Sequence, residues 1–505
     1  MTDTITLPMQ VDRLPGAAGS RQAGPCTIVI LGASGDLTRR KLIPSLLHLL
    51  DDGLLPEDFS VLGVGRKPLD DAAFRAEQRT GSDTDERRWK RLAPHLHYLS
   101  ADLDLPDSFA AIAKRLESIE AKRGRERGRL FYLALPPSAY AETIEGLSRS
   151  GALPRRDSAD RRWARIIIEK PFGASLATAR TLNRIVKAAI GEHQVFRIDH
   201  YLGKETVQNL LVFRFANSIF EPVWNRDHIH HVQITAAESL GVEHRAPYYE
   251  EAGVVRDMFQ NHLLSLLSLT AMEPPARFQS EAVRDEKAKV LDAVHADLAV
   301  RGQYGPGTVA GKTVAAYREE AGVAAESVTP TYAAMRCLVD NWRWQGVPFF
   351  LRSGKRLARR ATEVAVQFHT PPHLVFPLEP GGRIAPNVLV FRVQPDEGLS
   401  LCFEIKRPGG GVRLTSARME FGYREGFGET PHDAYETLLL DCMAGDPMLF
   451  LRSDATEAAW RVVDPIIEQW EGEPPDDFPN YAAGSWGPAA VDNLIAQAGA
   501  AWRTP

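Results

Sequence analysis

Four polar side chains of different chemistry lie close together near the middle of the chain. Asp199, His200, Tyr201 and Lys204 bring a carboxylate, an imidazole, a phenol and an ammonium into the stretch Arg197–Glu205, which a glycine bends. A core strand does not accommodate so many polar groups, whereas His200 and Lys204 are donors suited to a phosphoryl group and Tyr201 adds a hydroxyl. The stretch predicts a site for a phosphorylated, hydroxyl-rich molecule; a structural His-Tyr pair at a strand end is the alternative.

A histidine lies within the apolar face of a second predicted element. Residues 256–267 have helical periodicity, and His262 falls inside their apolar stripe. One interpretation is a satisfied core imidazole, and the other is a partly desolvated general base whose pKa is tuned by a carboxylate. Asp257 lies about 140° away on the helical wheel, so it is badly placed as that carboxylate. Asp199 is the better candidate.

A glycine-rich turn, Gly32–Gly35, stands between an apolar strand at 27–31 and a helix. Glycines at such a turn let backbone amides approach a pyrophosphate, and the helix N-terminus adds partial positive charge. The usual dinucleotide fingerprint is GxGxxG, and this chain has GxxG, so a plain turn is the alternative. The position after the first strand favours a nucleotide site, with candidate contacts at Gly32, Ala33, Ser34, Gly35, Asp36 and Leu37.

The second predicted strand, residues 59–65, is followed by Arg66 and Lys67. In NAD-binding proteins this strand commonly ends in Asp or Glu, which binds the ribose 2′-hydroxyl, whereas an Arg here favours a 2′-phosphate. The sequence therefore favours NADP over NAD. A solvated Arg-Lys pair is the alternative.

A third group of candidate residues is strongly basic. The nine residues from Arg352 to Arg360 include five arginines and lysines, among them Lys355. They form either a solvated loop face or an anion or sugar contact made by the second half of the chain.

Two strand patterns divide the chain and would position these side chains. Continuous apolar runs alternate with helical segments and predict an N-terminal Rossmann-type, doubly wound parallel sheet, with strands at 27–31, 59–65, 130–135 and 165–169. Runs of period two predict a mainly antiparallel sheet, with strands at 230–236, 361–368, 387–393 and 399–405 and helices near 254–271, 277–297 and 432–445. We expect a flexible tail over 1–24, an α/β coenzyme domain over 25–198, and a larger α+β substrate-binding and oligomerisation domain over 199–505.

The composition excludes several classes of function. A length of 505 residues favours two domains, and a net charge of −5 gives no electrostatic case for nucleic acid or a membrane surface. The four cysteines are far apart, so they predict neither a zinc site nor a disulfide framework, and no metal-ligand cluster is visible. Without a signal pattern or an apolar run of about 18–20 residues, a cytoplasmic protein is expected by default.

Six segments together carry a resemblance to a known family. They are GASGDLTRRKL (32–42), FYLALPP (131–137), IIEKPFG (167–173), RIDHYLGKE (197–205), DMFQNHLL (257–264) and DNWRWQGVPFFLRSGKRL (340–357). In this order they resemble the glucose-6-phosphate dehydrogenases. The resemblance implies oxidation of β-D-glucose 6-phosphate at C1 to 6-phospho-glucono-1,5-lactone with hydride transfer to NADP+, the first step of the oxidative pentose phosphate pathway. It also implies a homodimer or homotetramer built through the large sheet.

The resemblance also assigns roles to individual residues. His262 matches the general base, Asp199 the carboxylate that orients it, and Lys170 a catalytic lysine between coenzyme and sugar. The substrate phosphate is expected at His200, Tyr201 and Lys204, and further substrate contacts at Glu238, Asp257, Lys355 and Arg360. The coenzyme is expected at the 32–37 turn, Lys170 and Arg66, with Arg66 at the 2′-phosphate.

The chain departs from the family at two positions. Pro330 stands where the family often has Glu, and Ala361 stands where the animal enzymes carry a lysine that contacts a second, structural NADP. The second departure argues against a structural NADP site. Two rival functions remain: another sugar dehydrogenase of the glucose–fructose oxidoreductase kind, and a catalytically silent NADP-binding sensor. The first should not need a phosphate site, and the second would not need both His262 and Asp199.

Overall fold

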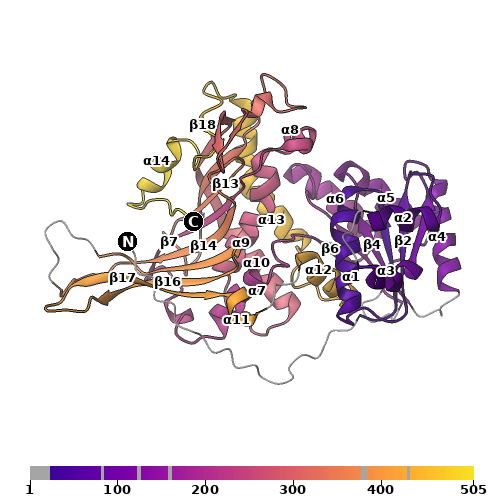
Figure 1. Cartoon of the computed structure of the whole chain (residues 1–505), viewed down its shortest axis with the longest axis horizontal. Helices are drawn as coiled ribbons and strands as arrows, with labels where there is room; N and C mark the ends of the chain where they lie inside the picture. The colour runs from indigo at the N-terminus through magenta and orange to yellow at the C-terminus, as the bar shows by residue number, and fades with distance from the viewer. Residues whose placement is uncertain (1–22, 81–84, 122–126, 157–161, 377–383, 429–432) are drawn as a thin grey trace.

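The computed structural model describes residues 23–80, 85–121, 127–156, 162–376, 384–428 and 433–505. The flexible tail predicted for residues 1–24 lies, apart from its last two residues, outside the described residues. Figure 1 shows a compact α/β part, in indigo and purple, beside a part dominated by one long sheet.

The first part is built on a parallel sheet of order β3-β2-β1-β4-β5-β6, the order of Rossmann-type folds. Its strands are mostly apolar and buried on both faces, which is why they appear as continuous runs in the sequence. The doubly wound sheet predicted from those runs is confirmed. The strands are β1 Cys26–Leu31, β2 Phe59–Gly65, β3 Leu96–Ser100, β4 Gly128–Leu133, β5 Ala164–Ile168 and β6 Val195–Arg197.

Helices connect these parallel strands. The last of them, α6, begins with a capping box in which the Ser175 and Thr178 side chains bond each other's backbone amides. The α-helices are α1 Ile43–Asp51, α2 Asp71–Thr80, α3 Glu86–Leu92, α4 Asp107–Glu120, α5 Tyr140–Arg149 and α6 Leu176–Ala189; a π-helical turn, η1, spans Thr38–Leu42, and short 3-10 turns are η2 Ala93–His95, η3 Pro137–Ala139 and η4 Glu192–Gln194.

The second part contains a sheet of order β17-β16-β15-β14-β7-β13-β12-β8, antiparallel except for the parallel pair β7 and β13. This confirms the predicted mainly antiparallel sheet. Its strands are β7 Ile229–Ala237, β8 Val294–Gly302, β12 Tyr332–Val339, β13 Phe349–Gly354, β14 Ala361–Phe368, β15 Val388–Gln394, β16 Gly398–Lys406 and β17 Leu414–Gly422; the short strands are β9 Tyr304–Gly305, β10 Gly307–Val309, β11 Lys312–Val314 and β18 Tyr481–Ala482.

The remaining helices pack around this sheet and reach back to the first part. They are α7 Glu205–Phe215, α8 Ala246–Val254, α9 Leu264–Ala271, α10 Ser280–Ala293, α11 Tyr423–Phe427, α12 Ala434–Ala444, α13 Ser453–Gly472 and α14 Ala490–Ala496, with the π-helical segment η7 Val255–Leu263 and the 3-10 turns η5 Glu221–Val223, η6 Glu243–Arg245 and η8 Tyr317–Glu319. Among the described residues, no helix is both long and apolar enough to cross a bilayer.

Helix α12 lies against the parallel sheet although it comes late in the chain (Figure 1). Lys41 Nζ lies 2.7 Å from Asp433 Oδ2, and His48 Nδ1 lies 2.6 Å from Glu436 Oε1. The Arg165 guanidinium donates to the carbonyl of Cys442 over 2.8 Å. The end of the chain therefore joins the two parts, a contact that the sequence pattern did not predict.

Two predicted helices differ from the structure. The helix predicted over 277–297 ends at Ala293, because β8 begins at Val294 and pairs antiparallel with β12. The helix predicted over 254–271 includes the π-helical segment η7, with Gly253 at φ 59° just before it. A π-helix closes its hydrogen bonds one residue later than an α-helix and is frequent at functional sites. The prediction that His262 lies on the apolar face assumed regular α-helical turns, which η7 does not have.

Candidate active site

The first pair of the site joins two parts of the fold. Asp199 follows β6, His262 lies in η7, and His262 Nδ1 and Asp199 Oδ1 are 2.5 Å apart with both side chains buried. Asp199 Oδ1 also accepts the backbone N–H of Tyr201 over 3.0 Å. When Nδ1–H of His262 donates to the carboxylate, Nε2 carries the lone pair. Within the described part of the chain, Nε2 has no hydrogen-bond partner, so it can accept a proton from a ligand.

Burial sets the protonation of this pair. It lowers the pKa of His262 below its ordinary value of 6.5, and the charge of Asp199 only partly reverses that shift. Burial opposes ionisation of Asp199, but the charge and hydrogen bond of His262 outweigh it and hold the pKa of the carboxyl low. At neutral pH the pair is a carboxylate and a neutral imidazole, the state that a general base requires.

Two aromatic neighbours enclose the imidazole. The Tyr201 ring stacks on His262 with centroids 4.2 Å apart, and the His200 ring meets it edge-on at 4.6 Å. Burial lowers the pKa of His200 well below its ordinary value, and His262 and Lys170 add to that shift, so His200 is neutral. The His200 ring also lies 6.3 Å from that of Tyr435. His200 and Tyr201 therefore also hold the base in place, which their sequence positions did not suggest.

A cationic end of the site lies beside the Tyr201 hydroxyl. Gln394 donates to that hydroxyl over 3.3 Å and accepts from the Arg360 guanidinium over 3.0 Å. The Lys204 ammonium lies 6.0 Å from the centroid of the Tyr201 ring. Burial lowers the pKa of Lys204, and the negative charge of Glu397 partly offsets this shift. The positive charge of Arg360 lowers the pKa further, which means that Lys204 and Arg360 are close enough to repel each other. Such a pair of cations fits a bound dianion.

Two lysine–carboxylate pairs lie at the ends of parallel strands. Lys170, just after β5, donates to Asp257 Oδ1 over 3.0 Å and to its backbone carbonyl over 2.9 Å. Lys355, just after β13, donates to Glu238 Oε2 over 2.7 Å. Glu238 follows β7, and β7 pairs with β13 in parallel register, so both residues leave the same edge of the sheet. These carboxylates are placed to accept bonds from hydroxyl groups.

The glycine-rich turn fits a dinucleotide phosphate. Gly32 has φ 89°, and a Cβ there would lie 2.1 Å from the carbonyl oxygen of Ala134. A Cβ at Gly65, the last residue of β2, would lie 3.1 Å from Ser34 Oγ. The turn therefore lies beside the end of β2, and the exposed Arg66 follows directly. The Asp36 carboxylate already forms an ion pair with Arg40, four residues later in the chain, over 2.9 Å.

Three side chains of the site also have the spacing of metal ligands. One ligand atom each of Asp199, His200 and His262 lies within 4.8 Å of the others. The sequence had suggested no such cluster, because His262 is far from the other two along the chain. The hydrogen bond between Asp199 and His262 already accounts for their approach.

Several site residues had no signal in the sequence. Gln394 and Thr362 reach the Tyr201 hydroxyl from β15 and β14. Glu169 is partly buried beside Lys170 and accepts from the hydroxyl of Tyr132 over 2.5 Å, with the Tyr435 hydroxyl 3.4 Å away. Burial raises the pKa of Glu169 despite these bonds. Glu169 stands in the quoted IIEKPFG segment, which is the one signal that could have found it.

The fold and these side chains together define a class of protein. A parallel sheet of the 3-2-1-4-5-6 order with a close-approach glycine in its first turn binds a dinucleotide at the carboxyl ends of its strands. Lys170 and Asp199 follow two such neighbouring strands, β5 and β6. A neutral base beside that edge suits an alcohol, which loses a proton as its hydride departs. The class is an NAD(P)-dependent dehydrogenase.

Comparisons with known proteins narrow the class to a family. The model of the "Glucose-6-phosphate dehydrogenase, NAD binding domain" matches residues 29–209, and that of the C-terminal domain matches residues 211–503. The glucose-6-phosphate 1-dehydrogenase of Aggregatibacter actinomycetemcomitans is 46% identical over 498 residues, covering 96% of this chain and 98% of the relative. That of Treponema pallidum is 44% identical over 503 residues and covers 97% of each.

A solved structure agrees with this match. It is described as a glucose-6-phosphate dehydrogenase in complex with its substrate glucose-6-phosphate, and it superposes with a TM-score of 0.87 at 32% identity, covering 96% of this chain and 99% of that one. The chain belongs to the glucose-6-phosphate dehydrogenase family.

Proposed function

We propose that this protein oxidises D-glucose 6-phosphate at C1 to 6-phospho-D-glucono-1,5-lactone and passes the hydride to NADP+, the first step of the oxidative pentose phosphate pathway. The observation that carries this proposal is the buried pair of His262 and Asp199, with Nε2 left without a partner among the described residues. Family membership supports the substrate and the coenzyme.

The site residues divide the work of such a reaction. His262 Nε2 takes the proton of the C1 hydroxyl as hydride leaves C1, and Asp199 holds the ring in the required tautomer. Lys204 and Arg360, with the Tyr201 hydroxyl, hold the phosphate at the other end of the sugar. Asp257 and Glu238 accept bonds from sugar hydroxyls, and their lysine partners remain as donors. When bound, the coenzyme supplies the hydride acceptor.

The coenzyme would lie along the first turn of the parallel sheet. The backbone amides of Gly32, Ala33, Ser34 and Gly35 would hold its pyrophosphate, with Asp36 and Leu37 at the start of the following helix, and Lys170 would contact both coenzyme and sugar. Gly32, at φ 89° and with a Cβ excluded by the Ala134 carbonyl, makes the tight turn that the first glycine makes in such sites, which supports this placement.

One assay tests the proposal against its rivals. Absorbance of the reduced coenzyme is followed with glucose 6-phosphate and NADP+, then with glucose in place of its phosphate, then with NAD+. We expect the fastest reduction with the phosphorylated sugar and NADP+. Equal rates on glucose would favour a sugar dehydrogenase without a phosphate site, and NADP+ binding without reduction would favour a sensor.

Lys204→Ala is expected to raise KM for glucose 6-phosphate roughly 10- to 100-fold, because a hydrogen bond from a charged group is lost. Turnover at saturating substrate should fall much less, because Lys204 lies at the phosphate end and away from the base. Steady-state kinetics measure both constants, with the exposed Lys289→Ala as the control. An equal loss with unphosphorylated glucose would contradict the role of Lys204.

Arg66→Ala is expected to lower the ratio of kcat/KM for NADP+ to that for NAD+ roughly 10-fold, since a 2′-phosphate would lose a charged partner. The exposed position of Arg66 directly after β2 supports this role. Initial rates with each coenzyme give the ratio, and KM for the sugar is the internal control. An unchanged ratio would mean that other residues hold the 2′-phosphate.

We also propose that the protein is a homo-oligomer assembled through the large sheet. A groove of about 480 Å³ lies between α7 and strands β15–β17, with Val212, Phe213, Leu401, Met419 and Phe421 in its lining. Apolar grooves of this kind often bind another protein surface. Met419→Glu is expected to reduce the sedimentation coefficient to that of a single chain, while the exposed Val328→Glu leaves it unchanged. An unchanged coefficient in the Met419 variant would contradict this interface.

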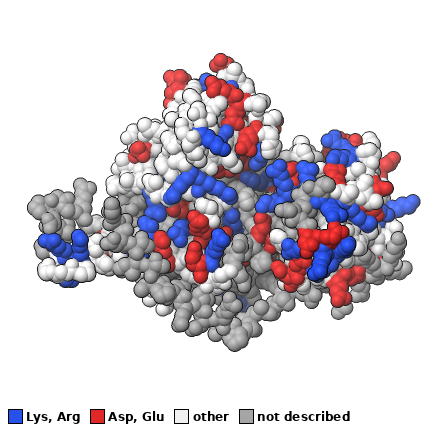
Figure 2. All heavy atoms as spheres, viewed as in Figure 1, with Lys and Arg blue, Asp and Glu red and all other residues white. Residues whose placement is uncertain are grey.

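Three further expectations concern the domain boundary, the cellular setting and nucleic-acid binding. Division of the chain near residue 198 is supported by the end of β6 at Arg197. A reducing, cytoplasmic setting is supported by the four cysteines, which are all free. We expect no nucleic-acid partner because the net charge is −5. Figure 2 shows acidic and basic side chains interspersed on the one face drawn.

A further inference from the structure

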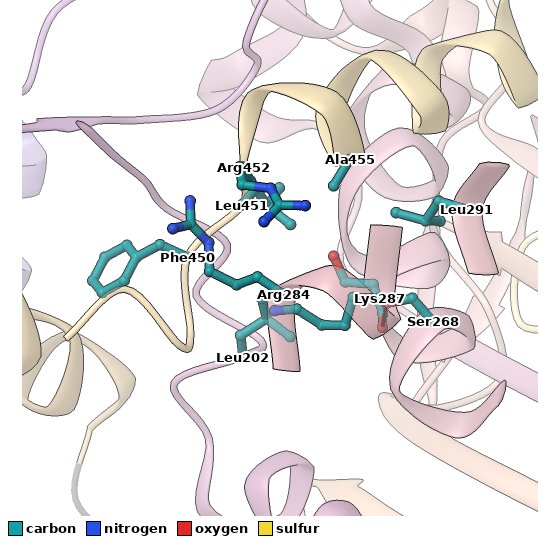
Figure 3. A pocket seen from close by; sticks show the side chains of 10 residues that line it. Leu202, Ser268, Arg284, Lys287, Leu291, Phe450, Leu451, Arg452 and Ala455 are labelled. Atoms are coloured by element: carbon teal, nitrogen blue, oxygen red, sulfur yellow. Dashed lines mark hydrogen bonds between the residues drawn. The ribbon is translucent and has the colours of Figure 1, made fainter. Parts of the chain in front are cut away.

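A small cavity lies behind the loop that carries Asp199. Leu202, whose N–H donates to the Asp199 carbonyl over 3.0 Å, lines it from the loop. Ser265 and Ser268 of α9 and Lys287 of α10 contribute polar groups. Figure 3 shows Leu202, Ser268 and Lys287 around this space. The cavity has a volume of about 10 Å³, which is room for one water molecule, and the hydroxyl and ammonium groups can bond such a water.

Lys287 carries a buried charge without a carboxylate in contact. It is 4% exposed, its ammonium donates to the carbonyl of Met448 over 3.1 Å, and it forms no ion pair among the described residues. Burial, with smaller contributions from the charges of Arg284 and Arg452, lowers its pKa to about 7, and Asp199 opposes that shift. Asp199 is therefore the anion on which the charge of Lys287 acts.

The two arginines beside Lys287 are balanced by other carboxylates. Arg284 donates to Glu281 over 2.6 Å, and the closest contact of Arg452 is 2.6 Å to Asp285. The carboxylates near the two guanidinium groups are Glu192, Glu281, Asp285 and Asp454. Lys287 differs from both arginines, because its charge is left to act on the Asp199 side of the cavity.

The Asp199 carboxylate has one oxygen that the catalytic pair does not use. Oδ1 lies at His262 Nδ1 and accepts the N–H of Tyr201, whereas Oδ2 is buried and, among the described residues, has no partner in hydrogen-bond geometry. The Ser265 hydroxyl lies close enough to this carboxyl to lower its pKa as a donor. Ser265 comes three residues after His262 and also lines the cavity, so it joins the cavity to the catalytic pair.

We propose that Lys287 is a positioning residue for the base, joined through one cavity water and Ser265 to the Asp199 carboxylate. The donors all point one way: Lys287 donates to the water, the water to Ser265 Oγ, and the Ser265 hydroxyl to Asp199. Hydrogen bonds aligned in this way strengthen one another in a buried site.

This chain of hydrogen bonds has two effects on the base. It holds the carboxylate against the imidazole, and the charge of Lys287 limits how far Asp199 raises the pKa of His262. The inference rests on the proposed function, in which His262 is the general base.

A high-resolution crystal structure of the full chain tests the water directly. We expect one ordered water within hydrogen-bond distance of both Lys287 Nζ and Ser265 Oγ. An empty cavity, or a water that contacts only one of these atoms, would overturn the proposal. The result is read without substrate or coenzyme, so it stands or falls apart from the proposed function.

The pH dependence of kcat/KM tests the effect on the base. Lys287→Met should move the inflection to higher pH by about 0.5 unit, because the protonated imidazole loses a repelling charge. Below the inflection the variant should be about threefold slower than the wild type, and the two should converge by pH 9, where Lys287 is itself neutral. Lys170 and Asp257 also act on His262, and neither changes in this variant.

The direction of the shift separates a charge from loosened packing. A carboxylate that has merely lost its support would raise the pKa of His262 less than before, so the inflection would move to lower pH. Lys287→Gln keeps a donor for the water without the charge, so it should shift the inflection as Met does, and it carries the test if the Met variant fails to fold. An unmoved inflection, or a shift to lower pH, would overturn the proposal.

A double-mutant cycle tests the part played by Ser265. In a Ser265→Ala background the shift caused by Lys287→Met should shrink, because residues of one hydrogen-bond network are not additive. An equal shift in both backgrounds would mean that Lys287 acts without Ser265 and would contradict the chain. Lys289→Met, which changes an exposed lysine of the same helix that pairs with Glu286, is the control. A wild type that does not reduce NADP+ with glucose 6-phosphate would refute the proposed function and leave the crystallographic test of the water in force.

Discussion

Replacing His262 with Asn is expected to lower turnover by ~10²–10⁴, the usual contribution of a positioned general base, while the dissociation constant of glucose 6-phosphate changes little. The amide keeps a polar group at this place but cannot take up a proton near neutral pH. Substrate affinity should persist because the groups expected to hold the phosphate are unchanged: Arg360 and the Tyr201 hydroxyl both bond Gln394, and the Lys204 ammonium lies 6.0 Å from the centroid of the Tyr201 ring. Binding and chemistry are therefore separable in this variant.

Two measurements are needed for the His262 variant. Absorbance of NADPH gives turnover, and calorimetric titration with glucose 6-phosphate gives the dissociation constant. His295→Asn is a suitable control, because this histidine is about half exposed and lies on β8 beside Asp340. Near-normal turnover in His262→Asn would remove His262 from the role of base. A parallel loss of affinity would instead indicate that the site has collapsed. This outcome must be checked because the His200 and Tyr201 rings pack on His262.

The strands that could be predicted, β1, β2, β4, β5, β7, β14, β15 and β16, have a local physical signal, whereas β3, β6, β12, β13 and β17 were not predicted. Buried parallel strands such as β1 and β2 are continuous apolar runs, and the strand of residues 361–368, although mostly buried, alternates enough in sequence to mark its whole length. The start of β8 was missed because the run before it is helical and Val294 continues the apolar pattern. The return of α12 to the first sheet was missed because it depends on contacts between distant segments.

The site residues also divide into those with a local sequence signal and those brought in by contacts between distant segments. Asp199 and Lys204 could be found because they share one short polar stretch, and His262 because a histidine interrupts an apolar face. Gln394 reaches the site from β15, and nothing near it in the sequence distinguishes it from an ordinary strand-end residue. Nor could the sequence show that β7 and β13 are parallel, which is what brings Glu238 and Lys355 together.

Replacing Asp199 with Asn should reduce kcat/KM and also move its pH dependence, and the direction of that movement distinguishes an orienting carboxylate from a structural one. In the wild type, burial holds the pKa of His262 below 6.5, so kcat/KM should rise with pH and level off with an inflection below that value. The negative charge of Asp199 raises the pKa of the imidazole, and an amide removes that contribution. The inflection should therefore move to lower pH.

The plateau should fall in the same variant by as much as ~10⁴, the loss seen when the comparable carboxylate of a serine protease becomes an amide. An amide can present its NH2 to Nδ1, which favours the tautomer with the proton on Nε2 and leaves that nitrogen unable to act as a base. Profiles of kcat/KM between pH 5 and 9 measure both effects, and Asp285→Asn controls for the loss of a surface carboxylate. A lower plateau with an unmoved inflection would mean that Asp199 supports the fold around His262 without tuning its basicity.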